Sequence, residues 1–320
     1  MFKIKSELKK AEVPMRDAYC NTLMQMAEKD ERIVALDADL ISSSGMKPFF
    51  AKFPERAIQC GIAEANMIGI AAGLSLTGKV PFAHSFGPFA SRRVCDQIFI
   101  SAAYANLNIR ILGSDPGVTA AYNGGTHMPF EDMGVLRSIP GITLIEPCDP
   151  VAVADIVSQL ADVYGVYYMR MARKSSIAVY EPGSTFEIGK GNLLRNGTDV
   201  TIIASGIMVA ESLKAAAALE ADGVSARVVD LFTWKPIDTE LIVDCAEKTG
   251  AIVTAENHNI FGGLGSAVAE AVTQNCPVPM EFVGVTDRFG QVGTEDFLRA
   301  EYGLTAENVA AAAKRAIERK

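Results

Sequence analysis

Helix-like and strand-like hydrophobic patterns alternate along the whole chain, with no low-complexity tract and no short repeat. Continuous apolar runs such as RIVALDADL (32–40) and VPFAHSF (80–86) are typical of buried strands in a parallel sheet. The second half continues the pattern, with strands predicted at 199–206, 225–232, 251–258 and 279–285 and helices at about 208–221, 238–247 and 264–274. The alternation predicts an α/β fold of two domains with mainly parallel sheets.

The domain boundary is predicted in a stretch of turn residues with hairpin-like alternation, 174–197. We place the first domain at 1–180, the junction at 181–197 and the second domain at 198–320. The segment GVYYMRMAR (165–173) is predicted to close the first sheet. A chain of 320 residues with 49% apolar composition can bury two cores of this kind.

Charge and cysteine usage narrow the class of protein. The formal net charge of −8 argues against non-specific nucleic-acid binding, which requires a basic face. The six cysteines form no C-x-x-C pair, so neither a zinc site nor a disulfide framework is indicated. The charged start MFKIKSELKK and the lack of a long uncharged apolar run favour neither export nor membrane spanning, so the cytoplasm is the expected location.

One carboxylate, Glu64, lies inside the otherwise uncharged apolar run Gln59 to Gly78. An unpaired ionised carboxylate would be costly in such surroundings. Glu64 must therefore be partnered, lie at an interface, or be protonated so that it can hydrogen-bond a ligand nitrogen. The plainer alternative is a first-turn carboxylate that interacts favourably with the helix dipole.

The segment GIAEANMIGIAAGL resembles the pyrimidine-binding domain of transketolase-type thiamine diphosphate enzymes, and further motifs follow in family order over roughly 16–318. The resemblance implies that Glu64 is the cofactor-activating carboxyl. It would hydrogen-bond the aminopyrimidine nitrogen N1′ and favour the imino tautomer, which can take the proton from thiazolium C2.

Three other motifs resemble parts of the family's cofactor pocket. In ALDADL, Asp39 would lie near the thiazolium ring, and Ile62 matches the aliphatic wedge that keeps the cofactor bent. HSFGPFASRRVCDQI resembles the segment whose aromatic rings sandwich the aminopyrimidine, with Phe86 and Phe89 as the candidates. Without the resemblance, a loop-capping Asp explains position 39 equally well. For Phe86 and Phe89, plain core packing would then be the favoured explanation.

A Gly-rich loop predicted between a strand at 108–115 and a helix at 131–137 carries His127. With only three histidines in the chain, metal chelation is not favoured. The resemblance implies that His127 hydrogen-bonds sugar hydroxyls and helps proton transfer, making it the second catalytic residue. Asn123 replaces an Asp that reads the substrate's C2 hydroxyl in bacterial and yeast transketolases, so the selectivity there is expected to differ.

Substrate anion binding is predicted from Arg16, Ser43 and Arg170, which match positions that hold the sugar's terminal phosphate in transketolases. Guanidinium forks suit a phosphate or another tetrahedral anion such as a sulfonate. The family's fourth ligand, a His, is replaced by Asp115 or, allowing a shift, by Ser114. An Asp would repel phosphate, which disfavours the usual sugar phosphates as substrates.

The G-D-G motif with which transketolases bind metal and pyrophosphate occurs nowhere in this sequence. The resemblance therefore implies the C-terminal subunit of a split transketolase. An N-terminal subunit would hold the diphosphate of thiamine diphosphate and its Mg²⁺ or Ca²⁺, in a heterotetramer of two of each chain. The loop GGLGSAV (262–268) is a weak phosphate-cradle signal, and tight helix packing is the favoured explanation, because the family's C-terminal domain has no essential chemistry.

Three alternatives stay open: the beta subunit of a 2-oxoacid dehydrogenase, a deoxyxylulose-phosphate synthase-like enzyme, and a non-catalytic structural partner. The His127 loop and the Arg16, Ser43 and Arg170 set favour a sugar ketol transferase over the dehydrogenase. The synthase is normally a single chain with its diphosphate domain attached. A structural subunit would have no need for a buried carboxylate at position 64. The sequence does not identify the donor or acceptor sugar.

Overall fold

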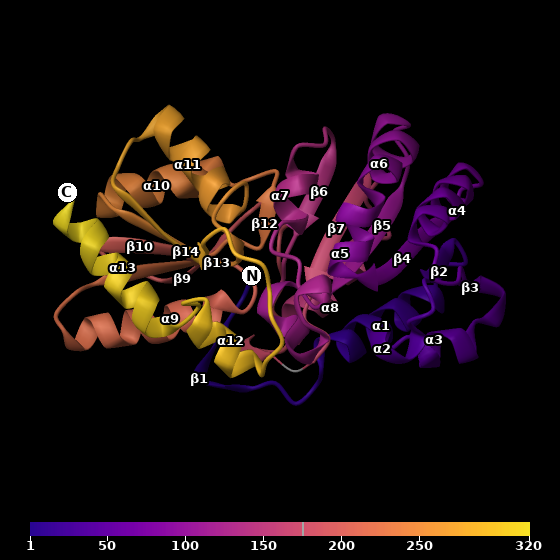
Figure 1. Ribbon diagram of the computed structural model, residues 1–320, viewed down its shortest axis with the longest axis horizontal. Coiled ribbons are helices and arrows are strands. Elements are labelled where there is room, and N and C mark those ends of the chain that lie inside the picture. The colour runs from indigo at the N-terminus through magenta and orange to yellow at the C-terminus, as the bar shows by residue number, and fades with distance from the viewer. Residues whose placement is uncertain (175) are drawn as a thin grey trace.

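The computed structural model describes residues 1–174 and 176–320, so Ser175 of the predicted turn-rich stretch lies outside the described residues. Two sheets lie side by side along the long axis of the molecule, each between two layers of helices (Figure 1). The seven-stranded sheet has the order β12-β6-β7-β5-β4-β2-β3. Its strands are β2 (Ile33–Asp37), β3 (Ala57–Gln59), β4 (Val80–Phe86), β5 (Ile109–Ser114), β6 (Ile142–Ile145), β7 (Val166–Met171) and β12 (Thr233–Lys235).

The prediction that the segment of β7 closes this sheet is wrong. β7 lies between β5 and β6, parallel to both, and β6 is covered in turn by the antiparallel β12 from the second half of the chain. A strand with neighbours on both edges and helices on both faces is apolar nearly throughout, as VYYMRM is. Through β12, the second half of the chain contributes a strand to the first sheet.

The second sheet has the order β14-β13-β10-β11-β9. Its four parallel strands agree with the predicted segments: β10 (Val200–Ala204), β11 (Ala226–Asp230), β13 (Ile252–Asn259) and β14 (Met280–Val285). The hairpin-like alternation of the junction does not produce a hairpin. β8 (Ile177–Tyr180) pairs instead with β1 (Ile4–Lys10), and β9 (Asn192–Arg195) pairs antiparallel with β11.

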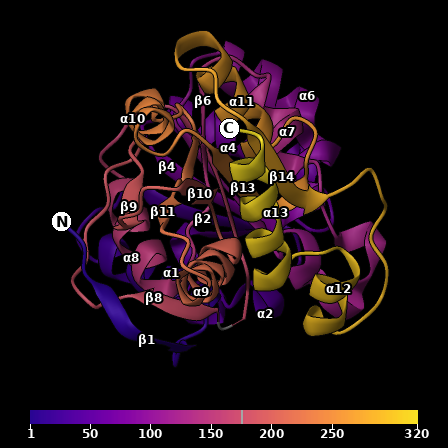
Figure 2. The same cartoon turned by 90° about the vertical axis from the view of Figure 1, so that its left-hand side faces the viewer.

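Helices cover both faces of each sheet. In the second domain α9 and α13 pack on one face and α10 and α11 on the other (Figures 1 and 2). The Thr305 hydroxyl accepts the Asn308 N–H and caps the last helix. The helices there are α9 (Met208–Ala221), α10 (Thr239–Thr249), α11 (Leu264–Asn275), α12 (Glu295–Glu301) and α13 (Ala306–Glu318).

In the first domain the helical stretch that follows β4 is interrupted at Ser91, whose φ and ψ of −128° and −88° are not helical. It continues as a π-helix at Ile98–Tyr104. The helices are α1 (Met15–Ala27), α2 (Ile41–Ser44), α3 (Lys47–Lys52), α4 (Glu64–Leu76), α5 (Gly87–Ala90), α6 (Cys95–Gln97), α7 (Asp132–Arg137) and α8 (Pro150–Gln159), with 3₁₀ turns at Pro54–Arg56, Arg92–Val94, Gly117–Asn123 and Gly125–His127. Across the described ranges, no helix has the length and apolar composition to cross a membrane.

Candidate active site

Glu64 is the first residue of α4 and is only 3% exposed. Its Oε1 accepts a hydrogen bond from the Ser85 hydroxyl at 3.3 Å, and its Oε2 pairs with Arg93 Nη1 at 2.8 Å. The sequence prediction that this carboxylate needs a partner is met by a residue that the sequence did not single out. The Ala63 side chain forms no cap at this helix start. As the first residue of α4, Glu64 also lies at the positive end of the helix dipole.

Arg93 places a flat cation over an aromatic ring. Its guanidinium carbon lies 3.8 Å from the centroid of Phe89 while its Nη1 contacts Glu64. The Arg93 side chain is 44% exposed, so both contacts can be exchanged for contacts with a ligand. Since α5, Ser91 and the following 3₁₀ turn are irregular, no helical periodicity in the sequence could have paired Arg93 with Glu64.

The two predicted aromatic residues and His127 form one cluster. The rings of Phe86 and Phe89 pack edge-to-face at 6.3 Å, and both contact the His127 ring, at 5.5 and 5.0 Å between centroids. His127 ends a 3₁₀ turn and lies within 2.9 Å of the Thr126 hydroxyl. Partial burial lowers the pKa of His127, and the nearby positive charges of Arg93 and Arg173 lower it further. The imidazole is therefore neutral around pH 7.

Arg173 extends this cluster. It was not among the site residues predicted from the sequence. Its guanidinium carbon lies 4.9 Å from the Phe86 centroid. The buried Asp115 accepts from the Arg173 backbone N–H at 3.0 Å and pairs with its Nε. Burial raises the pKa of Asp115, and the charge of Arg173 opposes that increase. The sequence did hold a signal for this pair. Asp115 and Arg173 follow the carboxyl ends of two adjacent parallel strands, where the sites of α/β proteins form.

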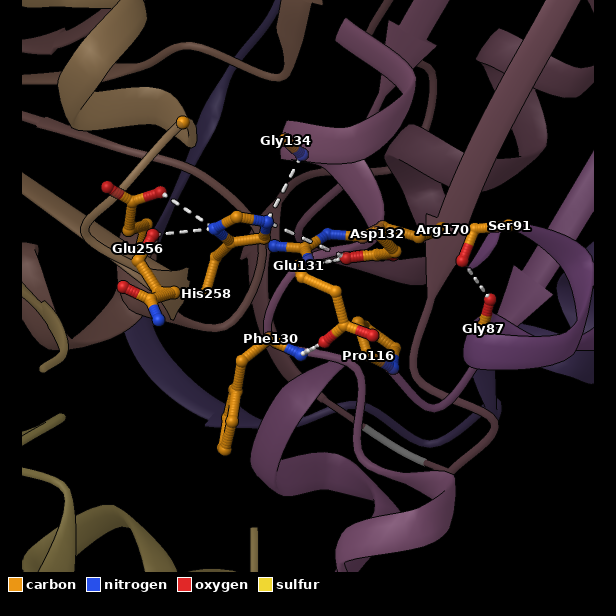
Figure 3. A network of polar contacts seen from close by, with 12 residues as sticks. Gly87, Ser91, Pro116, Phe130, Glu131, Asp132, Gly134, Arg170, Glu256 and His258 are labelled. Carbon is orange, nitrogen blue, oxygen red and sulfur yellow. Dashed lines mark hydrogen bonds and ion pairs between the residues drawn. The ribbon is translucent and has the colours of Figure 1, made fainter. Parts of the chain in front are cut away.

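Arg170 does not belong to this cluster, so its assignment to the substrate anion needs correction. Its side chain is 0% exposed and pairs with Asp132 at 2.8 Å and Glu146 at 3.0 Å. Figure 3 shows Arg170 beside Asp132 in the seam between the two domains. A guanidinium sealed between two carboxylates cannot reach a substrate. Side chains alternate between the faces of a strand, so Arg170 within β7 and Arg173 beyond its end serve different places.

Three of the other predicted residues, Arg16, Asp39 and Ser43, form a second group around α2. Arg16 Nη1 donates to the backbone oxygen of Ser43 at 3.1 Å. Asp39 is exposed, with a φ of 64°, and lines a pocket of about 520 Å³ together with Ser43. Ile62 is 78% exposed just before α4, and Asn123 is exposed in the loop that carries His127. No structural observation on these residues tests the roles predicted for them.

The GGLGSAV loop is occupied by the protein itself. The backbone N–H groups of Leu264 and Gly265 donate to the carboxylate of Glu256 at 2.7 and 2.9 Å. A Cβ added at Gly263 would lie 2.0 Å from Glu256 Oε2. The N-terminus of α11 thus binds an internal carboxylate, in agreement with the packing explanation. Burial raises the pKa of Glu256 to about 7.

Comparison with known proteins covers almost the whole chain. Residues 11–176 match the transketolase pyrimidine-binding domain, and residues 189–309 match the transketolase C-terminal domain. The chain is 51% identical over 314 residues to the 6-deoxy-6-sulfo-D-fructose transketolase subunit SqwH of Clostridium sp. (strain MSTE9), covering 98% of each protein. It is 37% identical to a subunit of the apulose-4-phosphate transketolase of Phocaeicola vulgatus, covering 93% of this chain and 95% of that protein.

A solved structure described as a split gene transketolase, inactive beta4 tetramer, is 43% identical and superposes with a TM-score of 0.90. The superposition covers 96% of this chain and 99% of that one. These matches confirm the predicted fold, the resemblance to split transketolases and the transferase assignment. The chain is a member of the transketolase family, whose enzymes transfer a ketol unit with the help of thiamine diphosphate.

Proposed function

We propose that this chain is the C-terminal subunit of a two-chain transketolase that transfers a two-carbon ketol unit from a ketose bearing a terminal sulfonate to an aldose. The observation that carries the proposal is the Arg173–Asp115 pair beside Phe86 and His127. The name of the relative at 51% identity, a 6-deoxy-6-sulfo-D-fructose transketolase subunit, supports a sulfonated ketose as the donor.

Glu64 and its neighbours fit the aminopyrimidine of thiamine diphosphate. Arg93 already makes the two contacts that a flat nitrogen-bearing ring needs, a hydrogen bond to Glu64 and stacking on Phe89. Glu64 would therefore hold a ring nitrogen of the cofactor, with Phe86 and Phe89 beside the ring. When bound, the cofactor supplies the carbon that takes up the ketol unit. Asp39 and Ile62 remain candidates for further contacts with it.

His127 is proposed to work on the sugar. A neutral imidazole can accept a proton from one hydroxyl and donate to another, which an imidazolium cannot do. Partial burial, together with the positive charges of Arg93 and Arg173, lowers the pKa of His127 and favours this neutral form. Asn123 in the same loop is proposed to contact the sugar near its C2 hydroxyl, and Arg16 and Ser43 to contact its anionic end.

The charge balance at Arg173 favours a singly charged anion. A phosphate monoester carries about −1.5 to −2 charges at pH 7, whereas a sulfonate carries one. Asp115 already neutralises part of the guanidinium charge through Nε. Reduced positive charge in the pocket weakens the binding of a doubly charged phosphate more than the binding of a singly charged sulfonate. The Asp therefore favours a sulfonated ketose over the usual sugar phosphates.

The partner subunit is proposed to cover the outer side of α4. Apolar or small residues are exposed just before this helix, on it and on the π-helix that packs beside it, as they are at protein interfaces. They are Ile62, Ala65, Gly69, Gly73, Leu76, Phe99, Ile100 and Tyr104. The partner would supply the G-D-G motif for the cofactor diphosphate and for Mg²⁺ or Ca²⁺, in a heterotetramer of two of each chain.

The test combines this chain with a separate subunit that carries the G-D-G motif, thiamine diphosphate and Mg²⁺. Donors would be 6-deoxy-6-sulfofructose, fructose 6-phosphate and fructose, with glyceraldehyde 3-phosphate as acceptor and products followed by mass spectrometry. We expect the highest kcat/KM for the sulfonated donor. Equal use of fructose would contradict the anion site, and conversion of pyruvate but no ketose would favour the synthase-like alternative. This chain alone should not bind thiamine diphosphate in calorimetry.

A further inference from the structure

The loop that carries His127 is held at both of its ends by the second domain. We call residues 116–131 the histidine loop. The three residues that end β13, Asn257 to Asn259, reach across the domain boundary and contact the loop. Their side chains play no part in the site described above.

Asn257 holds the beginning of the histidine loop. Its side chain is fully buried, its Nδ2 donates to the backbone oxygen of Pro116 at 2.8 Å, and its Oδ1 accepts the N–H of Val118 at 3.0 Å. A Cβ at Gly117, where φ is +51°, would lie 2.0 Å from Asn257 Oδ1. The amide of one side chain thus satisfies both the donor and the acceptor of a backbone turn in the other domain.

Asn259 holds the end of the loop, and His258 holds the helix that follows it. The Asn259 N–H donates to the backbone oxygen of Phe130 at 2.8 Å. His258 Nε2 accepts the N–H of Gly134 in α7 at 3.2 Å, so Nδ1 carries the proton and donates to the Asn259 backbone oxygen at 2.6 Å. Figure 3 shows His258 directed at Gly134. The loop is therefore fixed at two points, with His127 between them.

Between these points the backbone is not relaxed. Ala121 has φ and ψ of 47° and −116°, a conformation that L-residues seldom adopt. Such conformations persist only where the surrounding structure determines them. The contacts of Asn257 with Pro116 and Val118, five and three residues before Ala121, are part of those surroundings.

We propose that Asn257 is a positioning residue for ketol transfer, which from the C-terminal domain fixes the histidine loop so that His127 stays against Phe86 and Phe89. The catalytic consequence rests on the proposed role of His127. The expectation that the C-terminal domain has no essential chemistry then needs one qualification, because this domain sets the geometry of the catalytic loop.

The test uses Asn257→Ala, with Ser205→Ala as the matched control. Ser205 is also fully buried and also crosses the domain seam, donating to Glu146 at 2.6 Å, but it makes no hydrogen bond with the histidine loop. In the complex with the partner subunit, we expect Asn257→Ala to lower kcat on the order of 10- to 100-fold with unchanged affinity for thiamine diphosphate. Ser205→Ala should keep the wild-type kcat.

Two structural measurements separate positioning from general loss of structure. Hydrogen exchange of peptides from 116–131 should be faster in Asn257→Ala than in the wild type. Trp234, the single tryptophan of the chain, lies at the seam, 4.9 Å from the Arg170 guanidinium and 5.5 Å from the His258 ring. Its emission maximum should be unchanged if the seam is intact.

A second variant, Asn257→Asp, covers the case in which the alanine variant does not fold. The carboxylate can still accept the Val118 N–H but cannot donate to Pro116, so the histidine loop should again exchange faster than in the wild type. Unchanged exchange in a folded variant would overturn the proposal. Faster exchange with wild-type kcat would overturn the catalytic link. His127→Ala in the same assay identifies failure of the proposed function itself, since it should lower kcat regardless of Asn257.

Discussion

Two charged clusters of the first domain differ in whether a substrate can reach them. The first contains Glu64, Arg93, His127 and Arg173. Its Arg93 side chain is 44% exposed and pairs with a single carboxylate. The second is built around Arg170, which is fully buried between two carboxylates. Both use the same kinds of residue at the ends of strands and helices of the first domain.

The difference between the clusters lies in which charges can exchange partners. A buried ion pair is held by the cost of leaving either charge unpaired in a medium of low dielectric. A partly exposed pair can give up one partner to a ligand, because water and the ligand compensate for the loss. Burial and the number of partners, not residue type, separate a binding arginine from a structural one.

Glu64→Gln gives the largest expected effect within the open cluster. The amide is nearly isosteric, but it cannot share a proton with the cofactor ring as a carboxyl does. We expect ketol transfer by the complex with the partner subunit to fall by about 10³-fold or more, with assembly intact by size-exclusion chromatography. A rate close to the wild type would reduce Glu64 to a helix-start carboxylate.

Arg170→Met tests the sealed cluster. Removing the guanidinium leaves Asp132 and Glu146 buried without their cation, which should cost about 3–5 kcal/mol of the free energy of unfolding. Urea denaturation followed by Trp234 fluorescence measures the loss. Arg173→Met is the control, and it should cost less than half as much. Equal losses for the two variants would contradict the distinction between the clusters.

Arg173→Met should act on substrate affinity. An anchor distant from the reacting carbon stabilises ground and transition states alike, so KM rises while kcat changes little. Loss of one charge-assisted contact of about 2 kcal/mol corresponds to a roughly 30-fold higher KM for the sulfonated donor. Steady-state kinetics with unphosphorylated fructose gives the comparison, because its KM should not change.

Asp115→Asn should change which anion is preferred. The amide removes the charge that balances Arg173 but preserves a similar shape, so a doubly charged phosphate becomes more acceptable. We expect the ratio of kcat/KM for fructose 6-phosphate to that for the sulfonated donor to rise about tenfold, the equivalent of 1.4 kcal/mol. A constant ratio would mean that Asp115 only orients Arg173.

Asp230 extends the comparison to pH. This fully buried carboxylate accepts from the Tyr180 hydroxyl at 2.7 Å, and burial raises its pKa to about 7. A raised pKa stabilises the folded state at pH values below the pKa of the unfolded chain, and this contribution is lost as the pH rises through 7. Asp230→Asn should therefore be more favourable for stability at pH 8 than at pH 5 by roughly 3 kcal/mol in thermal unfolding, at about 1.4 kcal/mol for each of the two pH units between 5 and 7.

Local patterns predicted the elements well where the chain is regular. The strand Val80–Phe86 and the helix Met208–Ala221 have the predicted bounds, and a partner was one of the three options predicted for Glu64. The partner itself, Arg93, could not be identified, because it follows an irregular turn and meets Glu64 only through the tertiary fold.

The error at Arg170 has a related cause. Arg170 and Arg173 occur in one short run of sequence, and either could have matched an anion-binding position. Which of them is buried depends on Asp132 and Glu146, which belong to other elements. The pairing of β12 with β6 was likewise hidden, because it joins three residues of one domain to a strand of the other.

That pairing limits how the two halves could be shuffled, in evolution or by engineering. A fragment ending in the junction would lack Thr233–Lys235 and expose the backbone of β6 as an open edge, a site where other chains readily add a strand. A graft of the second domain onto a foreign partner would bring an orphan strand with no sheet to join. Two separate family models match the two halves. Because of the shared strand, we expect each half to fold properly only in the presence of the other.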